Sequence, residues 1–113
     1  MTDVKSLTIY TKSLDLVTKI YILITTNQSL AKDFFLCDQI KRASVSTACN
    51  ISEGYMRSRK QFKNYLDISS GSANEVITLL TVIEKVYGID IEQLQNEYLY
   101  LGRQIKAFSK SFI

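Results

Sequence analysis

The segment from Leu36 to Arg57, LCDQIKRASVSTACNISEGYMR, shows most clearly how this chain folds. Placed about 100° apart, as on an α-helix, its residues separate into two neighbouring stripes. One stripe is mostly apolar, with small or medium-sized residues: Leu36, Ile40, Ala43, Thr47, Ile51 and Gly54. The other stripe is polar along its whole length: Gln39, Arg42, Ser46, Asn50, Glu53 and Arg57. This combination predicts a long helix that packs closely against a neighbour and pairs specific polar groups.

The polar stripe has a structural and a catalytic interpretation. In the structural one, Arg42 pairs with Glu53 or Glu75, and the other groups bond a neighbouring helix or subunit, because buried polar groups need partners. This predicted structural network consists of Gln39, Arg42, Ser46, Asn50, Glu53 and Glu75. In the catalytic one, Glu53 and Glu75 act as paired carboxylates. The structural interpretation is favoured, because the chain has 11 Asp and Glu residues and two carboxylates on facing helices arise easily by chance.

Apolar residues spaced three and four apart predict further helices on both sides of this segment. The four expected helices cover about 5–26, 30–56, 59–87 and 91–112. Ser58 and Gln61 have the spacing of a capping box, Gly88 suits the end of the third helix, and Asp90 suits the start of the fourth. Short connections between long helices predict an all-α fold, an up-down-up-down antiparallel four-helix bundle formed by residues 1–113 as a single domain.

The composition supports a helical globular protein. The chain has 113 residues, no proline and four glycines, which favours long helices over a turn-rich β fold. No apolar run reaches the roughly 18 residues of a membrane span, and the N-terminus shows no secretory signal. Cys37 and Cys49 would lie about 18 Å apart on one helix, too far for a disulfide. Free thiols predict a cytoplasmic protein.

The third helix carries a second apolar face besides its main stripe. Its members are Ile68, Leu79, Val82 and Val86. One interpretation is a broad core face. The other is a subunit interface, because exposed apolar patches of this extent usually mark a partner surface, and it predicts a symmetric homo-oligomer.

Basic residues gather at the turn between the second and third helices. The candidate nucleic-acid contacts are Arg57, Arg59, Lys60 and Lys63, with Lys41 further upstream. Tyr55 and Phe62 are interleaved with them and could stack on single-stranded bases. The alternative is an ordinary solvated corner, since the net charge of +3 favours nucleic acid only weakly.

The inventory of catalytic residues is thin. The chain has no histidine, which removes the usual base near neutral pH and the commonest metal ligand. It also lacks a glycine-rich phosphate loop and a C-x-x-C motif. We therefore predict no catalytic residues, no cofactor, no metal and no small-molecule substrate. Three functions remain in order of preference: a nucleic-acid-associated oligomer, a protein-binding scaffold or adaptor that uses the second apolar face, and an enzyme.

The motifs of the second and third helices resemble a known family. The runs Gln39-Ile40-Lys41-Arg42-Ala43-Ser44-Val45-Ser46 and Asn50-Ile51-Ser52-Glu53-Gly54 are similar to the signature of the proteins encoded in intervening sequences of bacterial 23S ribosomal RNA genes. The resemblance extends to Leu7-Thr8-Ile9-Tyr10, to Phe62 and Leu66, and to Gly71-Ser72 followed by Glu75. It implies a cytoplasmic bacterial four-helix bundle, commonly a ring-shaped homopentamer. It also implies similarity to the accessory protein of diversity-generating retroelements, which binds nucleic acid through a basic surface.

Overall fold

The computed structural model describes Val4 and residues 7–112, and every regular element in that part of the chain is helical. The elements are α1 (Thr8–Thr25), α2 (Gln28–Ala31), α3 (Phe34–Tyr55), α4 (Arg59–Tyr87) and α5 (Glu92–Lys110). The predicted all-α class is confirmed. The predicted extension of the first helix to residues 5 and 6 lies outside the described residues.

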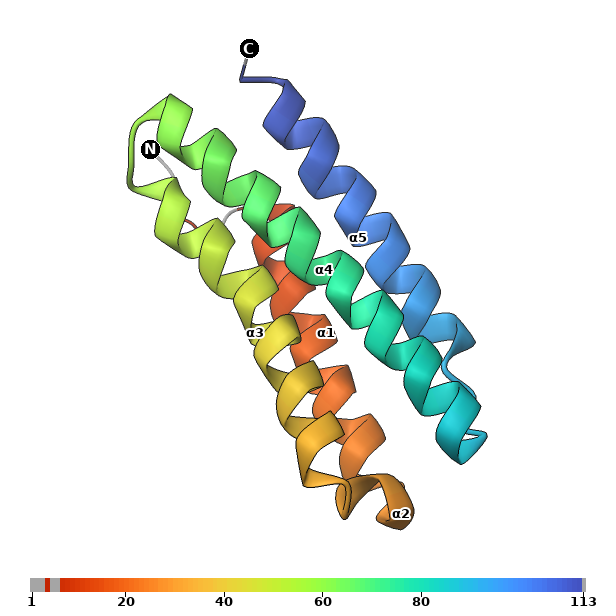
Figure 1. The fold of residues 1–113 in the computed structure, drawn as a ribbon. Coiled ribbons are helices and arrows are strands. Elements are labelled where there is room, and N and C mark those ends of the chain that lie inside the picture. The colour runs from red at the N-terminus through yellow and green to blue at the C-terminus, as the bar shows by residue number, and fades with distance from the viewer. Residues whose placement is uncertain (1–3, 5–6, 113) are drawn as a thin grey trace.

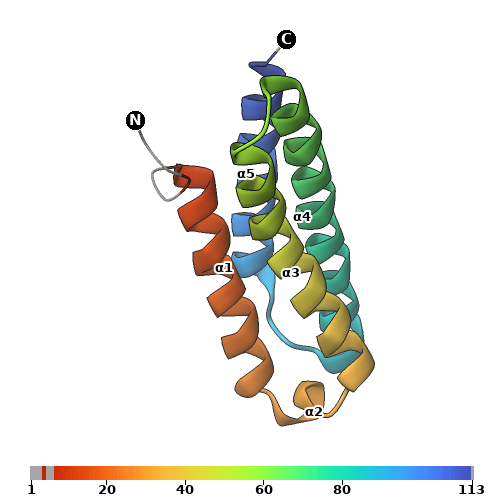
Figure 2. The same cartoon turned by 90° about the vertical axis from the view of Figure 1, so that its left-hand side faces the viewer.

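The four long helices run alternately up and down along one elongated body (Figures 1 and 2). The body measures 44 × 21 × 20 Å. α3 packs along α4, and α4 packs along α5, whereas α1 contacts α3 and, less extensively, α5. The α3–α4 turn and the end of α5 therefore lie at one end of the body, and α2 and the α4–α5 connection lie at the other.

The core is built from one stripe of each long helix. In α4 the buried residues alternate four and three apart: Phe62, Leu66, Ser69, Ala73, Val76, Leu80 and Ile83. In α3 they include the whole predicted apolar stripe: Leu36, Ile40, Ala43, Thr47, Ile51 and Gly54. Fully burying one leucine or isoleucine stabilises the fold by about 1.5–3 kcal/mol, so this alternation is the main source of stability.

The second helix was predicted over 30–56, and its predicted start is wrong. The chain forms the single turn α2, breaks at Lys32 and Asp33, and begins α3 at Phe34. The reason is the Asp33 side chain, which accepts a hydrogen bond from the backbone N–H of Leu36 at 3.1 Å and so caps a new helix. Leu30 is fully buried, and its carbonyl accepts a hydrogen bond from Cys37 Sγ at 3.1 Å. Leu30 and its bond to Cys37 therefore fasten α2 to the start of α3.

The other helix ends agree with the sequence in two places and differ in two. The capping box of Ser58 and Gln61 is confirmed, and Gly88 ends α4 in the left-handed region with φ 66°. The predicted N-cap at Asp90 is wrong, because Ile91 takes that position and is buried. Asp90 instead accepts a hydrogen bond from the N–H of Glu92 at 3.1 Å. The last helix ends at Lys110, two residues before the predicted end.

Candidate nucleic-acid interface

Basic side chains from the α3–α4 turn, α4 and α5 gather at one end of the body. The ends of α3 and α5 lie beside the start of α4 there (Figure 1). We call this surface the basic end, and it consists of Arg57, Arg59, Lys60, Lys63, Lys106 and Lys110. Two carboxylates, Glu53 and Asp67, form ion pairs with members of this group. The basic end therefore carries a surplus of positive charge.

An aromatic cluster holds the basic end together. Phe62 is buried, and its ring packs edge-on against Tyr55 and Phe108, with centroid distances of 5.9 and 5.7 Å. Phe112 packs on the same ring at 5.3 Å. The prediction that Phe62 could stack on bases is therefore wrong, because its faces are occupied by neighbouring rings. These contacts join α3, α4 and the end of α5 into one support for the cations.

Close approach of α3 and α4 fixes the turn. A Cβ atom placed on Gly54 would lie 2.5 Å from Tyr65 Cβ, so only glycine fits between the helices at this point. Arg57 in the turn pairs with Glu53 in the last turn of α3, and its guanidinium lies 5.1 Å over the ring of Tyr65. The hydrogen bond to Glu53 raises the pKa of Arg57. These contacts hold the Arg57 side chain against the surface of the turn.

Arg59 and Lys63 are positioned by the end of α5 and the residues that follow it. The guanidinium of Arg59 lies 5.1 Å over the ring of Phe112. Lys63 Nζ donates to Ser109 Oγ at 3.3 Å and lies 3.8 Å from Asp67. Sequence reasoning missed this contribution of α5, because Lys106 and Lys110 are far from the turn in sequence. An up-down-up-down order of helices was the one signal that could have placed them there.

Asp67 is the centre of the α4–α5 contact at this end. Its Oδ1 accepts a hydrogen bond from Ser109 Oγ at 2.6 Å and lies 3.5 Å from Lys106 Nζ. The hydrogen bond from Ser109, together with the charges of Lys106 and Lys63, lowers the pKa of Asp67. The carboxylate stays ionised and neutralises part of the charge around it.

Lys41 does not belong to the basic end. At about 1.5 Å per residue, about 24 Å of helix separates it from Arg57. Its Nζ lies 4.9 Å over the ring of Tyr21, on the side of α3 that faces α1. The grouping of Lys41 with the other four predicted nucleic-acid contacts is therefore wrong, because sequence proximity on one helix does not bring residues to the same end.

The polar stripe of α3 forms only part of the predicted network. Ser46 Oγ and Ser72 Oγ lie 2.9 Å apart and join α3 to α4, and Asn50 Nδ2 donates to Ser46 Oγ at 2.9 Å. The predicted pairing of Arg42 with Glu53 or Glu75 is wrong. Arg42 pairs with Asp38 one turn away at 2.9 Å, as expected for residues four apart on a helix.

The two glutamates of the catalytic interpretation do not meet. Glu53 lies seven residues beyond Ser46 towards the basic end, whereas Glu75 lies three residues beyond Ser72 in the opposite direction. The two carboxylates are thus separated by about 15 Å along the body. Gln39 is half-buried, and Glu75 is exposed with no ion pair inside the described part of the chain.

Another ionic contact joins α1 to α5. Lys12 and Lys19 both donate to Glu97 Oε1, at 3.0 and 2.9 Å. Burial alone would raise the pKa of Glu97, but the hydrogen bonds from the two lysines outweigh it, and the pKa is lowered. Nothing in the spacing of these residues pointed to this contact, which depends on how α1 and α5 come together.

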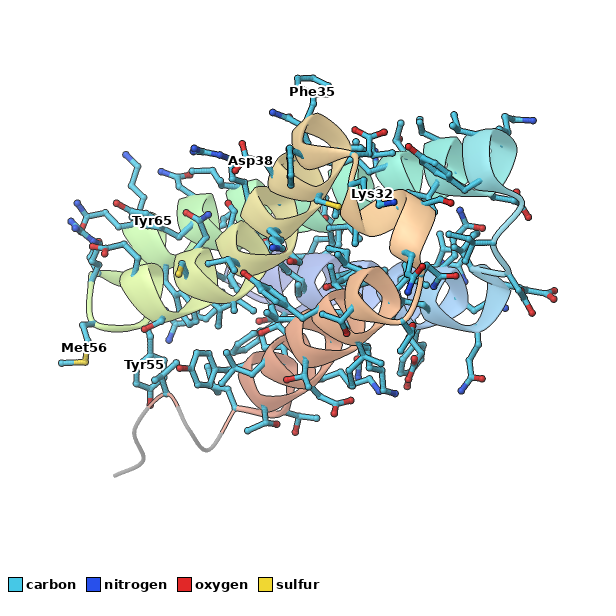
Figure 3. All side chains as sticks on the ribbon, turned by 90° about the horizontal axis from the view of Figure 1, so that it is seen from below. Lys32, Phe35, Asp38, Tyr55, Met56 and Tyr65 are labelled. Carbon is cyan, nitrogen blue, oxygen red and sulfur yellow. The ribbon has the colours of Figure 1, made fainter. Side chains whose placement is uncertain are left out.

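The second apolar face of α4 is largely exposed. Ile68 is 53% exposed, Val82 38% and Val86 62%, whereas Leu79 is half-buried and packs against the core. Other large apolar side chains are exposed on α3, with Phe34 at 81% and Phe35 at 75%. Phe35 points away from the body in Figure 3. A single copy therefore does not cover this face.

Among the residues that the structure describes, no group of three or more His, Cys, Asp or Glu side chains could hold a metal ion. No helix within Val4 and 7–112 is long and apolar enough to cross a membrane.

Fold and surface together define a small all-α protein with a basic end. The model of the 23S rRNA-intervening sequence protein family matches residues 5–108, and the chain belongs to this family. A crystal structure of a protein of unknown function from the S23 ribosomal protein family of Bacteroides thetaiotaomicron is similar, with a TM-score of 0.82 and 26% identity. The similarity covers 90% of this chain and 98% of that protein. No curated protein matches the sequence.

Proposed function

We propose that this protein is a non-enzymatic four-helix bundle that assembles into a ring-like homo-oligomer and associates with RNA or other nucleic acid through its basic end. The observation that carries the proposal is the convergence of six cations, from the α3–α4 turn, the start of α4 and the end of α5, on one end of the body. Contacts with aromatic rings and hydroxyl groups hold three of them in place. The name of the family also favours nucleic acid as the partner.

The geometry favours contact with phosphates. Lysine and arginine side chains that neutralise phosphates release counterions, which makes binding independent of sequence and dependent on salt. Base recognition would need an exposed aromatic platform, and Phe62 is buried in the aromatic cluster. We therefore expect weak sequence preference. In an oligomer the basic end is repeated, so weak single contacts add up.

A salt titration of RNA binding tests the proposal. The variant Lys60→Ala/Lys110→Ala removes two exposed cations from the basic end, and Lys32→Ala/Lys85→Ala removes two from the opposite end. We expect the first to weaken binding of a structured RNA about tenfold or more at low salt and to reduce the salt slope by about two per copy. We expect the second to bind like the wild type. Equal binding by both variants, or no mobility shift at low salt, would contradict the proposal.

Self-association is supported by the apolar side chains that one copy leaves exposed, above all on α3 and α4. Light scattering tests it, because a single copy has a mass of 12.9 kDa. We expect a multiple of this mass, and the family resemblance favours five copies. A mass of one copy at micromolar concentration would contradict the oligomer. The proposed location is the cytoplasm, and the free thiols support it.

A protein-binding scaffold or adaptor is the second candidate. The same exposed face of α4, with Ile68, Val82 and Val86, favours it, since apolar patches often bind partners. A pull-down that recovers one defined protein, survives nuclease treatment and is lost in Val86→Asp would support this function. Such a result would also show that RNA at the basic end is not needed to bind this partner protein.

A further inference from the structure

We propose that copies of this chain join through two different faces, with the outer side of α4 of one copy packed against the outer side of α3 and α1 of the next. In this contact Glu75 lies beside Lys41 of the neighbouring copy. The inference rests on the self-association proposed above and adds which surfaces and which charges meet.

The first surface is a second stripe on α4, which we call the α4 outer stripe. Its members are Ile68, Ser72, Glu75, Leu79, Val82 and Val86, spaced alternately four and three apart. This spacing is the one that packs helices side by side. The buried stripe of α4 has the same alternation about 120° away and is filled by the chain's own helices. Within the described part of the chain, Ser72 bonds Ser46 and Leu79 packs against the core, whereas Ile68, Glu75, Val82 and Val86 are exposed.

The second surface lies on α3, next to α1, and we call it the α3 outer stripe. Its members are Phe34, Asp38, Lys41, Val45, Ala48 and Ser52, again spaced alternately four and three apart. Leu14 and Tyr10 of α1 line a hollow with Ala48, Cys49 and Ser52 at one end of it. Val45 is 38% exposed and Leu14 44%. This surface offers apolar contacts on both sides of a groove between two helices.

The two stripes match in register when neighbouring copies stand at the same height. The contact between Ser46 and Ser72 sets these residues level, and α3 and α4 run in opposite directions. Cyclic symmetry about an axis parallel to the helices does not shift copies along that axis. Glu75 of one copy is then level with residue 43 of the next, which is about 3 Å along the helix from Lys41.

The same register pairs the apolar residues at both ends of the stripes. Ile68 is level with Asn50 of the next copy, beside Cys49 and the hollow that Leu14 lines. Val82 and Val86 fall on either side of Phe34, which is 81% exposed in a single copy. In both stripes, apolar residues therefore flank charged residues. The contact covers three of the most exposed apolar side chains, those of Ile68, Val86 and Phe34.

In the middle of the stripes Glu75 faces Lys41, while the neighbouring Asp38 is already paired with Arg42. Glu75 has no ion pair in the described residues, and Lys41 has only the ring of Tyr21. A carboxylate and an ammonium group that become enclosed between helices need each other, because an unpaired buried charge is costly. The pair therefore selects this register over others in which Glu75 would face an apolar residue.

The two stripes lie on adjacent sides of the body, because α3 packs between α1 and α4 (Figure 2). Contact between unlike faces continues from copy to copy and closes when each step turns in the same direction without a shift. The inferred assembly is a ring in which every copy uses both stripes.

Mixing two variants tests the inference directly. Ile68→Asp/Val86→Asp spoils only the α4 outer stripe, and Phe34→Asp/Val45→Asp spoils only the α3 outer stripe. Each variant alone should have the mass of one copy in light scattering. An equimolar mixture should give a particle of twice 12.9 kDa, because one intact contact remains between the two chains. Far-UV circular dichroism checks that both variants are folded.

A charge exchange provides a second test with exposed or half-buried residues only. Glu75→Lys and Lys41→Glu should each weaken association at least about tenfold, and the double variant should restore the wild-type mass. Lys85→Glu on α4 serves as the control and should leave the mass unchanged.

The outcomes separate the two proposals. A wild-type oligomer whose two stripe variants do not combine, or whose charge exchange does not restore the mass, would overturn the pairing of faces while self-association stands. A wild-type chain with the mass of one copy would overturn both.

Discussion

The two ends of the body are each fastened by one aspartate, but the partners differ. At the basic end, Asp67 accepts a hydrogen bond from Ser109 and has two lysines beside it. At the opposite end, Asp33 caps α3 and accepts a hydrogen bond from Tyr87 Oη at 2.6 Å, so its donors are uncharged. The Asp67 carboxylate thus neutralises part of the surrounding positive charge, whereas the Asp33 carboxylate caps the start of α3.

The comparison shows how a small helical protein can be firmly packed at both ends while the two ends differ in charge. The basic end keeps a surplus of positive charge around its aspartate. The opposite end mixes signs, with Lys32 and Lys85 beside Asp33, Glu84, Asp90 and Glu92. We therefore expect attraction for a polyanion to be strongest at the basic end, although the packing is continuous.

Removing a large core side chain from either end should have the largest effect. We expect Phe62→Ala to destabilise the fold by about 3–5 kcal/mol and Leu30→Ala by about 2–5 kcal/mol, because both side chains are buried. Only Phe62→Ala should also weaken RNA binding below the melting temperature, since its ring supports the cations of the basic end. Denaturant melts and the RNA titration measure the two effects. Equal RNA affinity for both variants would show that the aromatic cluster does not position the cations.

Glycine positions give the next largest effect. Gly54→Ala places a methyl group against Tyr65 Cβ, and we expect a loss of about 1–3 kcal/mol from overpacking. Gly71→Ala on α4 meets no atom within 4 Å and should gain about 0.5–1 kcal/mol from helix propensity. Thermal melts of the two variants should therefore shift in opposite directions. A shift of both in the same direction would contradict the close approach of the helices at the basic end.

Loss of the Asp33 side chain should have a moderate effect confined to the opposite end. Asp33→Ala removes the cap of α3 and the partner of Tyr87, and we expect a lower melting temperature with unchanged RNA binding. Asp33→Asn can still cap the helix and should lower the melting temperature less. If alanine and asparagine behave alike, the cap is not what holds α3 at Phe34.

The smallest effect concerns pH and salt. The pKa of Asp33 is lowered mainly by the hydrogen bond from Tyr87, and the pKa of Asp67 mainly by the one from Ser109. Each lowered pKa contributes stability above the unfolded-state pKa of about 3.9 and loses it as the pH falls through the folded-state value. The part that Asp67 owes to Lys63 and Lys106 should also weaken with salt. Melting temperatures of Asp33→Asn and Asp67→Asn, at pH 7 and pH 3 and at two salt concentrations, separate the contributions.

Local patterns predicted much of the fold. Apolar residues spaced three and four apart predicted a helix over 59–87, and Ser58 and Gly88 marked both its ends. The break at Asp33 was missed, because the apolar periodicity runs through it and the competing cap is a matter of one side chain.

The basic end was predicted only in part, for a different reason. Arg57 to Lys63 stand together in sequence, so composition revealed them. The contribution of Lys106 and Ser109 depends on how α5 returns along α4, which no local pattern encodes. Lys41 illustrates the reverse error, because a residue on the same helix can lie far from the group it was assigned to.

The ionic contact between α1 and α5 is redundant on one side, because two lysines of α1 share one glutamate of α5. Glu97 holds Lys12 and Lys19 at once, so a mutation that neutralises either lysine leaves the other bond in place. The carboxylate has no such substitute, and its loss would leave two like charges facing each other beside Asp15. Substitution of either lysine should therefore cost little stability. Substitution of Glu97 would break the ionic contact between α1 and α5.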